Sequence, residues 1–404
     1  MWLYILLLKI ASLFNRKARL LVDGEKQSLR YLQQQIDKSC SYVWFHAASV
    51  GEFEQARPII ERLRSEIERQ GRNEKILLTF FSPSGYEMRK NYNGADMVAY
   101  LPFATRRNAK RFLDIVQPVK AIFVKYEFWP AYLKELKKRD IQTYIISAIF
   151  RPQQLFFRWY GHWYRNLLKC FTTIFVQDQS SKSLLNQYDI CNVIVAGDTR
   201  FDRVVQIAKS SHSDSILETF ASHSERPILI AGSTWQPDED LLIKYFLSHN
   251  NLRLIIVPHE LDAAHLNRLR HRLGNNAVFY TEATLDSLND CRCLVLDTMG
   301  LLSSAYRYGQ IAYIGGGFGV GIHNTLEAAV YAMPVVFGPN YKKFREACDL
   351  IDCNGGFSVA DYAELEQVLN MLLLDNVEAG VNAGNYVKNN CGATPIIMKG
   401  IFQI

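Results

Sequence analysis

Short apolar runs alternate with amphipathic stretches along the first half of the chain. Five runs rich in β-branched and aromatic residues predict strands, at 42–48, 75–82, 121–129, 143–149 and 173–178. Stretches with apolar residues at helical spacing lie between them, such as 54–70, 106–116 and 130–138. Because the runs are apolar throughout, they are typical of strands buried on both faces. This half therefore predicts a parallel sheet covered by helices.

The second half repeats this rhythm, with predicted strands at 227–233, 252–259, 293–298, 311–317 and 333–339. The segment 197–215 between the halves is polar, and its second part is rich in serine, so it predicts an interdomain connection. The pattern thus predicts an α/β protein with two doubly wound, Rossmann-like domains, at 21–204 and 205–384. In such a pair we expect a central cleft between the carboxyl ends of the two sheets.

Length and composition agree with this division. A chain of 404 residues is too long for one ordinary core, and 49% hydrophobic with 21% charged residues excludes a disordered chain. The net charge of +6 suits a phosphorylated partner or a membrane surface and falls well short of a nucleic-acid-binding signature. The eight cysteines show no CxxC pair or Cys/His spacing, so we expect reduced thiols.

The first fourteen residues form a strongly apolar run, MWLYILLLKIASLF, which is followed by Arg16, Lys17 and Arg19. Lys9 interrupts the run, which is shorter than the roughly 20 residues that span a bilayer. The charge follows the run instead of preceding it, which argues against a secretory signal peptide. We expect residues 1–20 to associate with a membrane, with the basic residues at anionic headgroups. The alternative is a helix packed on the domain.

The segment HAASVGEFE (46–54) follows a predicted strand and carries the first candidate for chemistry. Ser49 and Gly51 form the turn, and Glu52 opens the next helix, where its carboxylate can accept a proton from an acceptor hydroxyl. The helix dipole alone also explains an acidic residue in a first helical turn, so both interpretations stay open.

Two further loops of this half follow predicted strands. TFFSPSGYE brings Ser82 and Ser84 to a helix N-terminus, where they either hold an anion or form a plain N-cap. KYEFWP places Lys125 and Glu127 at the carboxyl edge of the sheet, where substrates bind in such folds. A buried Glu127 would need a partner or water, because an isolated buried carboxylate is costly.

The segment GGGFGVGIHNTLEAA (315–329) has five glycines within its first seven residues. Glycine lets the backbone approach a phosphate closely, and the following helix supplies N–H donors. The spacing matches neither GxGxxG nor GxxxxGK[ST], so neither a dinucleotide enzyme nor a P-loop NTPase is supported. The segment predicts a ligand-binding turn, with Gly316, Gly317, His323, Asn324 and Glu327 as its candidate contacts.

Loops after three other predicted strands of this half are expected to converge with the glycine-rich turn in one nucleotide pocket. They contribute Ser233, Thr234, His259, Met299 and Gly300. The acidic stretch from Asp238 to Asp240 follows Pro237 and opens a helix, so we interpret it as a charged first turn and assign no metal.

Seven motifs follow one another along the chain: HAASVGE, SPSGYE, EFWP, GDTRFD, GST, DTMG and GGGFGVGIHNTLEAA. In this order they resemble the transferases of 3-deoxy-D-manno-octulosonic acid (Kdo), enzymes of lipopolysaccharide biosynthesis. The resemblance runs from the apolar N-terminus to about residue 350. It implies a GT-B fold, and we expect residues 385–404 to pack back on the first domain.

The resemblance implies CMP-Kdo as donor and a tetraacylated disaccharide lipid A precursor (lipid IVA) as acceptor. It also implies inversion at the anomeric carbon without a metal or other cofactor, at the cytoplasmic face of the inner membrane and without a nucleic-acid partner. Glu52 matches the family's proposed base, and Glu127 matches a second carboxylate beside the acceptor. Donor contacts are expected from Arg200, Ser233, Thr234, His259, Met299, Gly300, Gly316, Gly317, His323, Asn324 and Glu327, and acceptor contacts from Ser49, Gly51, Ser82, Ser84 and Lys125.

Two places depart from the family's pattern. The chain has Pro258-His259-Glu260 where Pro-Arg-His is usual, so a phosphate-binding arginine is missing there, and Arg200 or another basic residue is expected to replace it. Lys125 and Tyr126 stand where an acidic residue and a threonine are common, which leaves the number of transferred Kdo units open.

Two other functions stay open at this point. One is a different GT-B enzyme that uses a nucleoside-diphosphate sugar, such as an epimerase. The other is a non-catalytic membrane-surface protein that binds a nucleotide without turnover. The missing dinucleotide fingerprint disfavours a Rossmann oxidoreductase.

Overall fold

A computed structural model describes residues 2–210, 213–288, 291–319 and 321–404. The chain divides into two compact units, Met1–Arg203 with Cys391–Ile404, and Val204–Asn390. The second unit extends past the predicted end at residue 384, because helix α17 (Val377–Asn390) packs on α14 (Leu326–Ala329) and α15 (Arg345–Asp352) of the same unit. The segment that returns to the first unit therefore begins at Cys391 and contains α18 (Ala393–Phe402).

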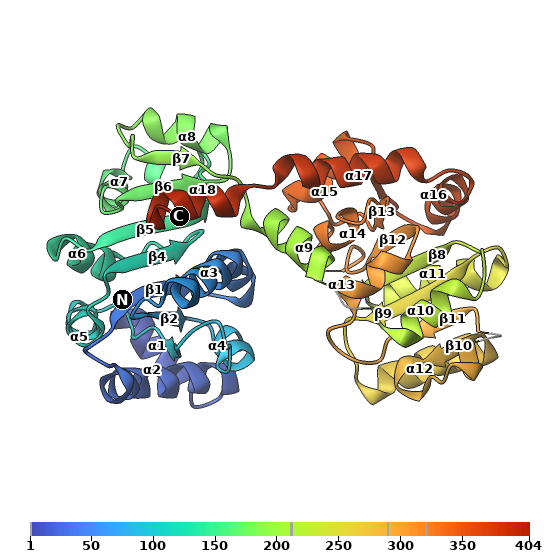
Figure 1. The fold of residues 1–404 in the computed structure, drawn as a ribbon, viewed down its shortest axis with the longest axis horizontal. Coiled ribbons are helices and arrows are strands. Elements are labelled where there is room, and N and C mark those ends of the chain that lie inside the picture. Colours follow the sequence, from blue (N-terminus) through green and yellow to red (C-terminus); the bar gives the residue numbers. More distant parts are fainter. Residues whose placement is uncertain (1, 211–212, 289–290, 320) are drawn as a thin grey trace. The chain divides into compact units, whose positions relative to one another are not determined.

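Seven parallel strands form the sheet of the first unit within the described residues, in the order β3-β2-β1-β4-β5-β6-β7 (Figure 1). They are β1 (Ser41–Ala47), β2 (Glu74–Phe80), β3 (Met97–Tyr100), β4 (Lys120–Val124), β5 (Gln142–Ala148), β6 (Thr173–Val176) and β7 (Val193–Val195). The central strands are almost completely buried, as expected for strands covered on both faces.

Helices cover both faces of this sheet. One apolar core contains residues of α2 (Arg16–Gln35), α5 (Arg106–Val116), α6 (Pro130–Lys138) and α7 (His162–Leu168). A second core, on the opposite sheet face, contains residues of α3 (Val50–Gln70) and α18. The remaining helices of the unit are α1 (Trp2–Ala11), α4 (Pro83–Arg89), α8 (Gln179–Asn186) and the start of α9 (Thr199–Ser210), within which the chain passes into the second unit.

The described residues of the second unit form another seven-stranded parallel sheet, in the order β10-β11-β9-β8-β12-β13-β14. The strands are β8 (Ile228–Thr234), β9 (Arg253–Pro258), β10 (Ala277–Phe279), β11 (Cys293–Val295), β12 (Ile311–Ile314), β13 (Val335–Phe337) and β14 (Gly356–Ser358). Its other helices are α10 (Ser215–Ser222), α11 (Gln236–Ser248), α12 (Ala263–Leu273), α13 (Leu302–Ala305) and α16 (Tyr362–Leu374).

The predicted fold class is confirmed: two doubly wound, parallel α/β units of GT-B type. All ten predicted strands are present, and helices 106–116 and 130–138 have the predicted bounds. Four strands were missed, namely β3, β7, β10 and β14. They have three or four residues each, which is too short for a periodic signal to emerge.

The apolar N-terminal segment folds into α1, followed by α2, against which it packs. Asn15 caps α2 by accepting a hydrogen bond from the backbone N–H of Ala18. Among the described residues, no helix has the length and apolar character required to cross a bilayer.

Candidate active site

The strand order of the first unit reverses between β1 and β4, because β2 and β3 extend the sheet on one side and β5 to β7 on the other. Loops that leave two such strands diverge, and ligands bind at the carboxyl edge where they part. Glu52 lies in the first turn of α3, just after β1, and Glu127 lies just after β4. The two predicted catalytic carboxylates therefore flank the switch point of one sheet.

Glu52 is half-buried and has an unusual protonation equilibrium. Its Oε2 accepts a hydrogen bond of 2.5 Å from the backbone N–H of Ala48, and its own N–H donates to Oγ of Ser49. Burial and, to a smaller extent, the charge of Glu127 raise the pKa of Glu52 to about 7, although the Ala48 hydrogen bond and the charge of Lys125 act in the opposite direction. A carboxylate that titrates near neutral pH is suited to accept a proton from a hydroxyl.

Glu127 is held by a buried hydrogen-bond network that the sequence did not reveal. Oε2 of Glu127 accepts a bond of 2.5 Å from Nε1 of Trp129 and lies 3.0 Å from Nε2 of His46. Nδ1 of His46 lies 2.9 Å from the hydroxyl of Thr79, which in turn accepts a bond of 2.8 Å from Nε1 of Trp44. An ionised carboxylate only accepts hydrogen bonds, so the contact at Nε2 requires a proton on that nitrogen.

His46 is thus a functional candidate that the sequence reasoning missed. It pairs with Thr79 in β2 and Phe123 in β4, at the switch point, and its side chain is fully buried. Burying an imidazole against a carboxylate is costly unless both are satisfied, and here both are. The available signal was a histidine near the carboxyl end of a strand, six residues before Glu52.

Basic side chains lie near Glu52 and its neighbour Tyr126. Lys125 adopts a left-handed backbone conformation (φ 60°) and places its Nζ 5.5 Å from the ring centre of Tyr126. Burial raises the pKa of Tyr126, and the charges of Arg151, Glu52 and Arg200 also act on it, so these groups lie around one ring. The first unit therefore concentrates cationic groups next to Glu52.

Arg200 lies in α9 and belongs to the first unit, next to the carboxylates. Its Nε donates to Oδ2 of Asp198 at 2.9 Å, and its Nη2 lies 2.8 Å from the same oxygen. Asp198 is buried and also accepts bonds from Gln55 of α3. The pairing fixes the guanidinium beside the switch point, and its contact with the donor remains a prediction.

The serines predicted to contact the acceptor cap helices. Ser49 caps α3, and Ser82 caps α4 by accepting a bond of 3.0 Å from the N–H of Gly85. The hydroxyl of Ser84 lies 3.4 Å from that of Ser82, and Gly51 is exposed in the first turn of α3. Their positions at the carboxyl ends of β1 and β2 are compatible with a helix cap and with a contact to the acceptor, so the acceptor contact stays a prediction.

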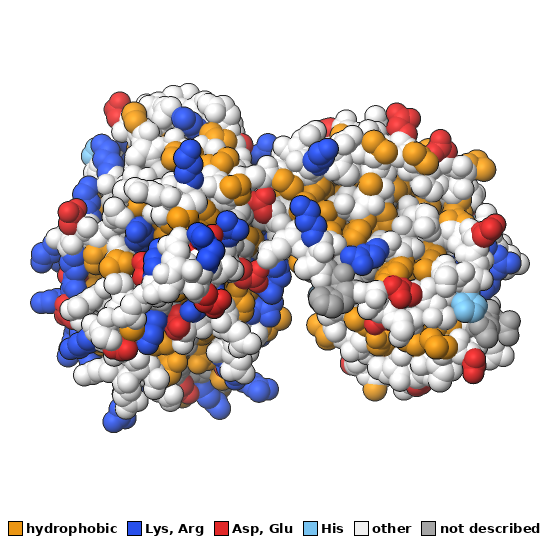
Figure 2. Space-filling model, in the orientation of Figure 1, with side chains coloured by type: hydrophobic (Ala, Val, Ile, Leu, Met, Phe, Trp, Pro, Cys, Tyr) orange, Lys and Arg blue, Asp and Glu red, His pale blue; other side chains and the backbone are white. Residues whose placement is uncertain are grey.

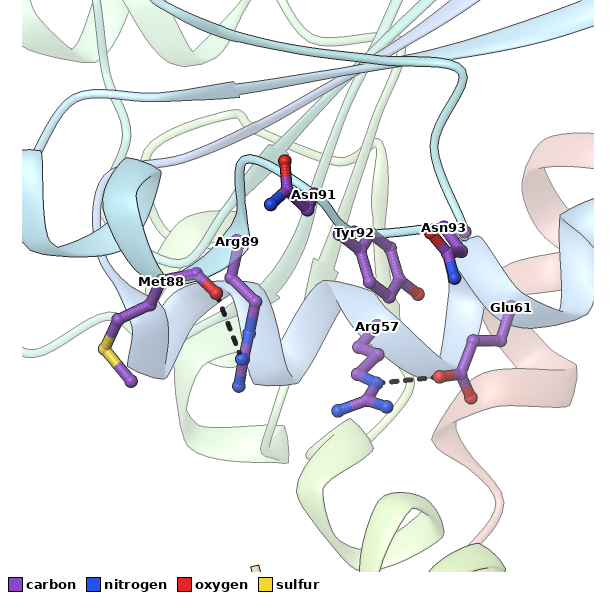
Figure 3. A pocket seen from close by; sticks show the side chains of 8 residues that line it. Arg57, Glu61, Met88, Arg89, Asn91, Tyr92 and Asn93 are labelled. Atoms are coloured by element: carbon purple, nitrogen blue, oxygen red, sulfur yellow. Dashed lines mark hydrogen bonds and ion pairs between the residues drawn. The ribbon is translucent and has the colours of Figure 1, made fainter. Parts of the chain in front are cut away.

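A pocket of about 460 Å³ lies further along α3 (Figure 3). It is lined by Arg57, Glu61, Met88, Arg89 and residues 91–94. Its charges neutralise one another, because Nε of Arg57 donates to Glu61 at 2.7 Å and Nη2 of Arg89 donates to Glu54 at 2.9 Å. None of the predicted site residues lines this pocket.

The second unit has its own switch point, between β8 and β12. Ser233 and Thr234 end β8, and the glycine-rich turn follows β12. Neighbouring β9 and β11 lead into the loops that carry His259, and Met299 with Gly300. The predicted donor residues thus follow adjacent strands of one sheet edge, which is the arrangement of a nucleotide pocket in such folds.

Close backbone packing accounts for part of the glycine-rich turn. A Cβ on Gly315 would overlap the carbonyl oxygen of Ser233, and one on Gly317 would lie 2.5 Å from the N of Gly338. Gly316 has a φ of 91°, and its N–H donates to Oδ2 of Asp238 at 2.9 Å. Glycine is needed here to fit the turn between β8 and β13, whatever ligand it binds.

Asp238 therefore does more than open a helix. It is buried, and it accepts hydrogen bonds from the N–H of Trp235, the N–H of Gly316 and the hydroxyl of Tyr313. Burial raises the pKa of Asp238, which these bonds partly offset. Its carboxylate ties the first turn of α11 to the glycine-rich turn. Within the described ranges, no group of three or more acidic, His or Cys side chains is placed to hold a metal ion.

Three aromatic rings stack at this edge. Trp235 stacks on His259 at 4.7 Å between ring centres, and His259 stacks on His323 at 4.4 Å. Nε1 of Trp235 donates to Nε2 of His323 at 3.2 Å, which places the proton of a neutral His323 on Nδ1. Burial and the nearby His259 lower the pKa of His323. Trp235 was not predicted, although it directly follows the GST motif.

The remaining donor candidates lie around the same turn. Nδ2 of Asn324 donates to Glu327 at 2.9 Å, and Glu327 also accepts a bond of 2.6 Å from Ser303. Helix α14 is a single turn that begins at Leu326, so its dipole contributes little. Met299 is 77% exposed, and Gly300 has a φ of 93°, as a turn residue.

We expect Gly315→Ala to lower the free energy of unfolding of the second unit by about 1–3 kcal/mol. The added methyl group would press on backbone atoms of Ser233 and Thr234, which cannot turn aside as the end of a flexible side chain can. Gly319→Ala is the matched control, because its Cβ would meet only the oxygen of Gly316 at 3.7 Å. Urea unfolding followed by circular dichroism measures both. Equal midpoints for the two variants would contradict the packing argument.

The two doubly wound parallel units place the protein among those with a GT-B type of fold. Solved structures with the same fold include UDP-N-acetylglucosamine 2-epimerase from Neisseria meningitidis (TM-score 0.61, 15% identity, 90% of this chain and 100% of that one). A glycosyltransferase from Rickettsia africae also aligns, with a TM-score of 0.55 and 14% identity over 90% of this chain and 97% of that one. At these identities the likeness shows the GT-B type of fold alone.

Sequence comparison finds relatives among the Kdo transferases. The model of the family described as 3-deoxy-D-manno-octulosonic-acid transferase (kdotransferase) matches residues 22–203. The 3-deoxy-D-manno-octulosonic acid transferase of Aquifex aeolicus is 26% identical over 85% of this chain and 90% of its own length, and that of Haemophilus influenzae is 26% identical over 85% and 81%. The protein is a glycosyltransferase related to the Kdo transferases, and the predicted resemblance is confirmed.

Proposed function

We propose that this protein transfers Kdo from CMP-Kdo to the disaccharide lipid A precursor, with Glu52 as general base. The observation that carries the proposal is the position of Glu52. Its half-buried carboxyl has a pKa of about 7 and lies at the switch point of the unit that the Kdo transferase family model matches. The relatives named above support the choice of sugar and acceptor.

In the proposed step, the acceptor's primary hydroxyl attacks the anomeric carbon of Kdo and gives its proton to Glu52. A bond forms between the acceptor oxygen and the anomeric carbon, while the bond from that carbon to the phosphate oxygen of CMP breaks. A single displacement of this kind inverts the anomeric configuration. Glu127, held by His46 and Trp129, keeps a negative charge beside Glu52 and so keeps it basic near neutral pH.

The donor side of the proposal rests on the second unit. Backbone N–H groups of the glycine-rich turn, together with the side chain of His323, would bind the phosphate, and Glu327 would accept bonds from the ribose hydroxyls. The departing CMP carries a single phosphate, so donors of this kind and a basic side chain such as Arg200 can stabilise it without a cation. We therefore expect transfer to persist in the presence of a chelator.

The proposal places the enzyme at the cytoplasmic face of the inner membrane. In α1 and the loop after it, Leu7, Leu13 and Phe14 are exposed, with Arg16 and Lys17 exposed next to them. An apolar helix flanked by basic residues is typical of a segment lying in the lipid headgroup region. The buried side chain of Ile5 and the contact with α2 also support the alternative of a helix packed on the domain.

Incubation of the purified protein with CMP-Kdo and lipid IVA, followed by mass spectrometry of the lipid, tests the function. We expect a mass increase of one or more Kdo residues, and the increment gives their number. Competition with CMP and UDP separates the proposal from the nucleoside-diphosphate-sugar alternative, since only CMP should inhibit. Nucleotide binding without a lipid product would favour a non-catalytic protein.

A further inference from the structure

The segment between β5 and β6 exposes an unusual set of aromatic rings. Trp159 is 91% exposed, Tyr160 56% and Trp163 48%. The buried rings of Phe156 and Phe157 anchor this segment in the apolar core. Water-exposed tryptophan is rare in a soluble protein, and a group of such rings marks a surface that binds another apolar phase.

Backbone contacts hold the exposed rings in place. Nη1 of Arg165 donates to the carbonyl oxygens of Phe156 and Arg158, at 2.9 and 3.2 Å. The N–H of Gly161 donates to the carbonyl of Arg158 at 2.8 Å. Trp159 and Tyr160 pack edge to face with ring centres 5.2 Å apart. The rings are therefore presented by an ordered turn.

The helices next to this turn are strongly basic. Nζ of Lys134 in α6 lies 4.8 Å from the ring centre of Trp163, and α6 contacts both α7 and α5. The exposed basic side chains of α5 and α6 are Arg106, Arg107, Lys110, Arg111, Lys134, Lys137 and Lys138. In the described part of the chain none of these seven forms an ion pair, and the two acidic residues of the helices, Asp114 and Glu135, pair with Arg139.

This basic strip continues to the N-terminal helices, because α5 also contacts α2, and α2 contacts α1. In Figure 2, Lys and Arg side chains gather along the edge of the first unit where Figure 1 places α5, α6 and α7. One surface of the unit thus carries exposed apolar side chains at both ends and cations between them. We call it the basic-aromatic face; it comprises the exposed residues of α1, α2, α5 and α6 and of 158–164.

We propose that the basic-aromatic face binds the surface of an anionic lipid bilayer, with the rings of Trp159, Tyr160 and Trp163 in the headgroup layer as a second attachment beside residues 1–20. Tryptophan and tyrosine are the residues enriched at that depth, and Lys and Arg bind anionic lipid. The proposal deepens the proposed function, because α2, α5 and α7 begin at the carboxyl edge of the sheet, where Glu52 lies. A lipid acceptor in the bilayer would then present its sugar to that edge.

The composition of the face favours lipid over a protein partner. Three of the seven basic residues on α5 and α6 are arginines and four are lysines, and lysine is depleted from protein interfaces. Three further cations, Arg16, Lys17 and Arg19, extend the strip beside the exposed side chains of Leu13 and Phe14. An excess of positive charge next to apolar side chains matches an anionic leaflet, where each cation strengthens binding roughly fivefold.

Cosedimentation of the full-length protein with phosphatidylcholine vesicles, with and without phosphatidylglycerol, tests the proposal. The double variant Trp159→Ser, Tyr160→Ser is expected to lower the partition coefficient roughly tenfold on anionic vesicles. Arg106→Glu with Arg107→Glu is expected to lower it at least as much, and to weaken its dependence on salt. Acidic residues suit the first turn of α5, so this variant should fold.

Matched controls change equally exposed residues of the second unit. Leu374→Ser with Val377→Ser and Lys342→Glu with Lys343→Glu should leave vesicle binding unchanged. Wild-type binding by either test variant would overturn the proposal and assign attachment to residues 1–20 alone. Loss of affinity for a DNA duplex but not for vesicles would overturn it in favour of a nucleic-acid surface.

Failure of this proposal and failure of the proposed function are distinguishable. With detergent-dispersed lipid IVA, both test variants should transfer Kdo at the wild-type rate, because the basic-aromatic face contains no residue assigned to the chemistry. If the wild-type protein bound anionic vesicles through this face yet transferred no Kdo, the function would be wrong and the membrane surface would stand. If the wild-type protein transferred Kdo and both variants still bound vesicles like the wild type, the proposed function would stand and the membrane surface would be wrong.

Discussion

Glu52→Gln is expected to lower the rate of Kdo transfer by roughly 10²–10⁴-fold, because an amide does not accept the acceptor's proton. The substitution should preserve the local structure, since the amide oxygen can still accept the hydrogen bond from the N–H of Ala48. Steady-state kinetics with CMP-Kdo and lipid IVA measures the loss. It should appear in kcat, with little change in the KM for CMP-Kdo.

Glu68→Gln is the matched control for this variant. Glu68 lies on the same helix, is exposed, and should be dispensable. If Glu52→Gln folded like the wild type and kept near-wild-type kcat, then Glu52 would be a helix-capping residue, as its contacts with Ala48 and Ser49 alone would suggest. The helix-dipole interpretation of this position would then be sufficient.

The fold was predictable because the longer strands of both sheets are apolar runs in the sequence. A run such as 42–48 is buried at nearly every position of β1, which only a strand covered on both faces allows. The short edge strand β14, of three residues, gave no comparable signal, and β10 is only partly buried. Their positions are fixed by pairing with β13 and β11, which is a tertiary effect.

The candidate site was predictable only in part. Loops that follow strands pointed to Glu52, Glu127 and the glycine-rich turn, since substrates bind at carboxyl edges of parallel sheets. The partners of these residues depend on strand order, which the sequence did not give. His46 meets Glu127 across 81 positions of sequence because β1 lies next to β4.

The same limit applies to the second unit. The acidic residue Asp238 carried the signature of a first helical turn, and it does cap α11. That its carboxylate also holds Gly316 follows from the adjacency of β8 and β12, which places the two segments together. Sequence spacing therefore predicted which residues lie at the carboxyl edge of the sheet more readily than it predicted their contacts.

His46→Phe is expected to shift the acidic limb of the pH–rate profile to lower pH by roughly 0.5–1 unit. In the wild type, activity should rise as Glu52 loses its proton near pH 7, where burial and the charge of Glu127 place its pKa. Removing the imidazole takes a hydrogen-bond donor from the buried carboxylate of Glu127, so the negative charge next to Glu52 loses its stabilising contact. Without that neighbouring charge, Glu52 should titrate at lower pH.

Glu127→Gln removes the same charge directly and should move the limb in the same direction, whereas His271→Gln, at an exposed site of the second unit, should leave it in place. A purely structural role for His46 would lower stability or kcat and leave the limb where it is, which would refute its coupling to Glu52 through Glu127. A phenylalanine suits the test, because the ring would lie among Trp44, Phe123 and Trp129, which already surround the imidazole. The pH dependence of kcat/KM measures the limb in the free enzyme, so a shift there reports the resting charge next to Glu52.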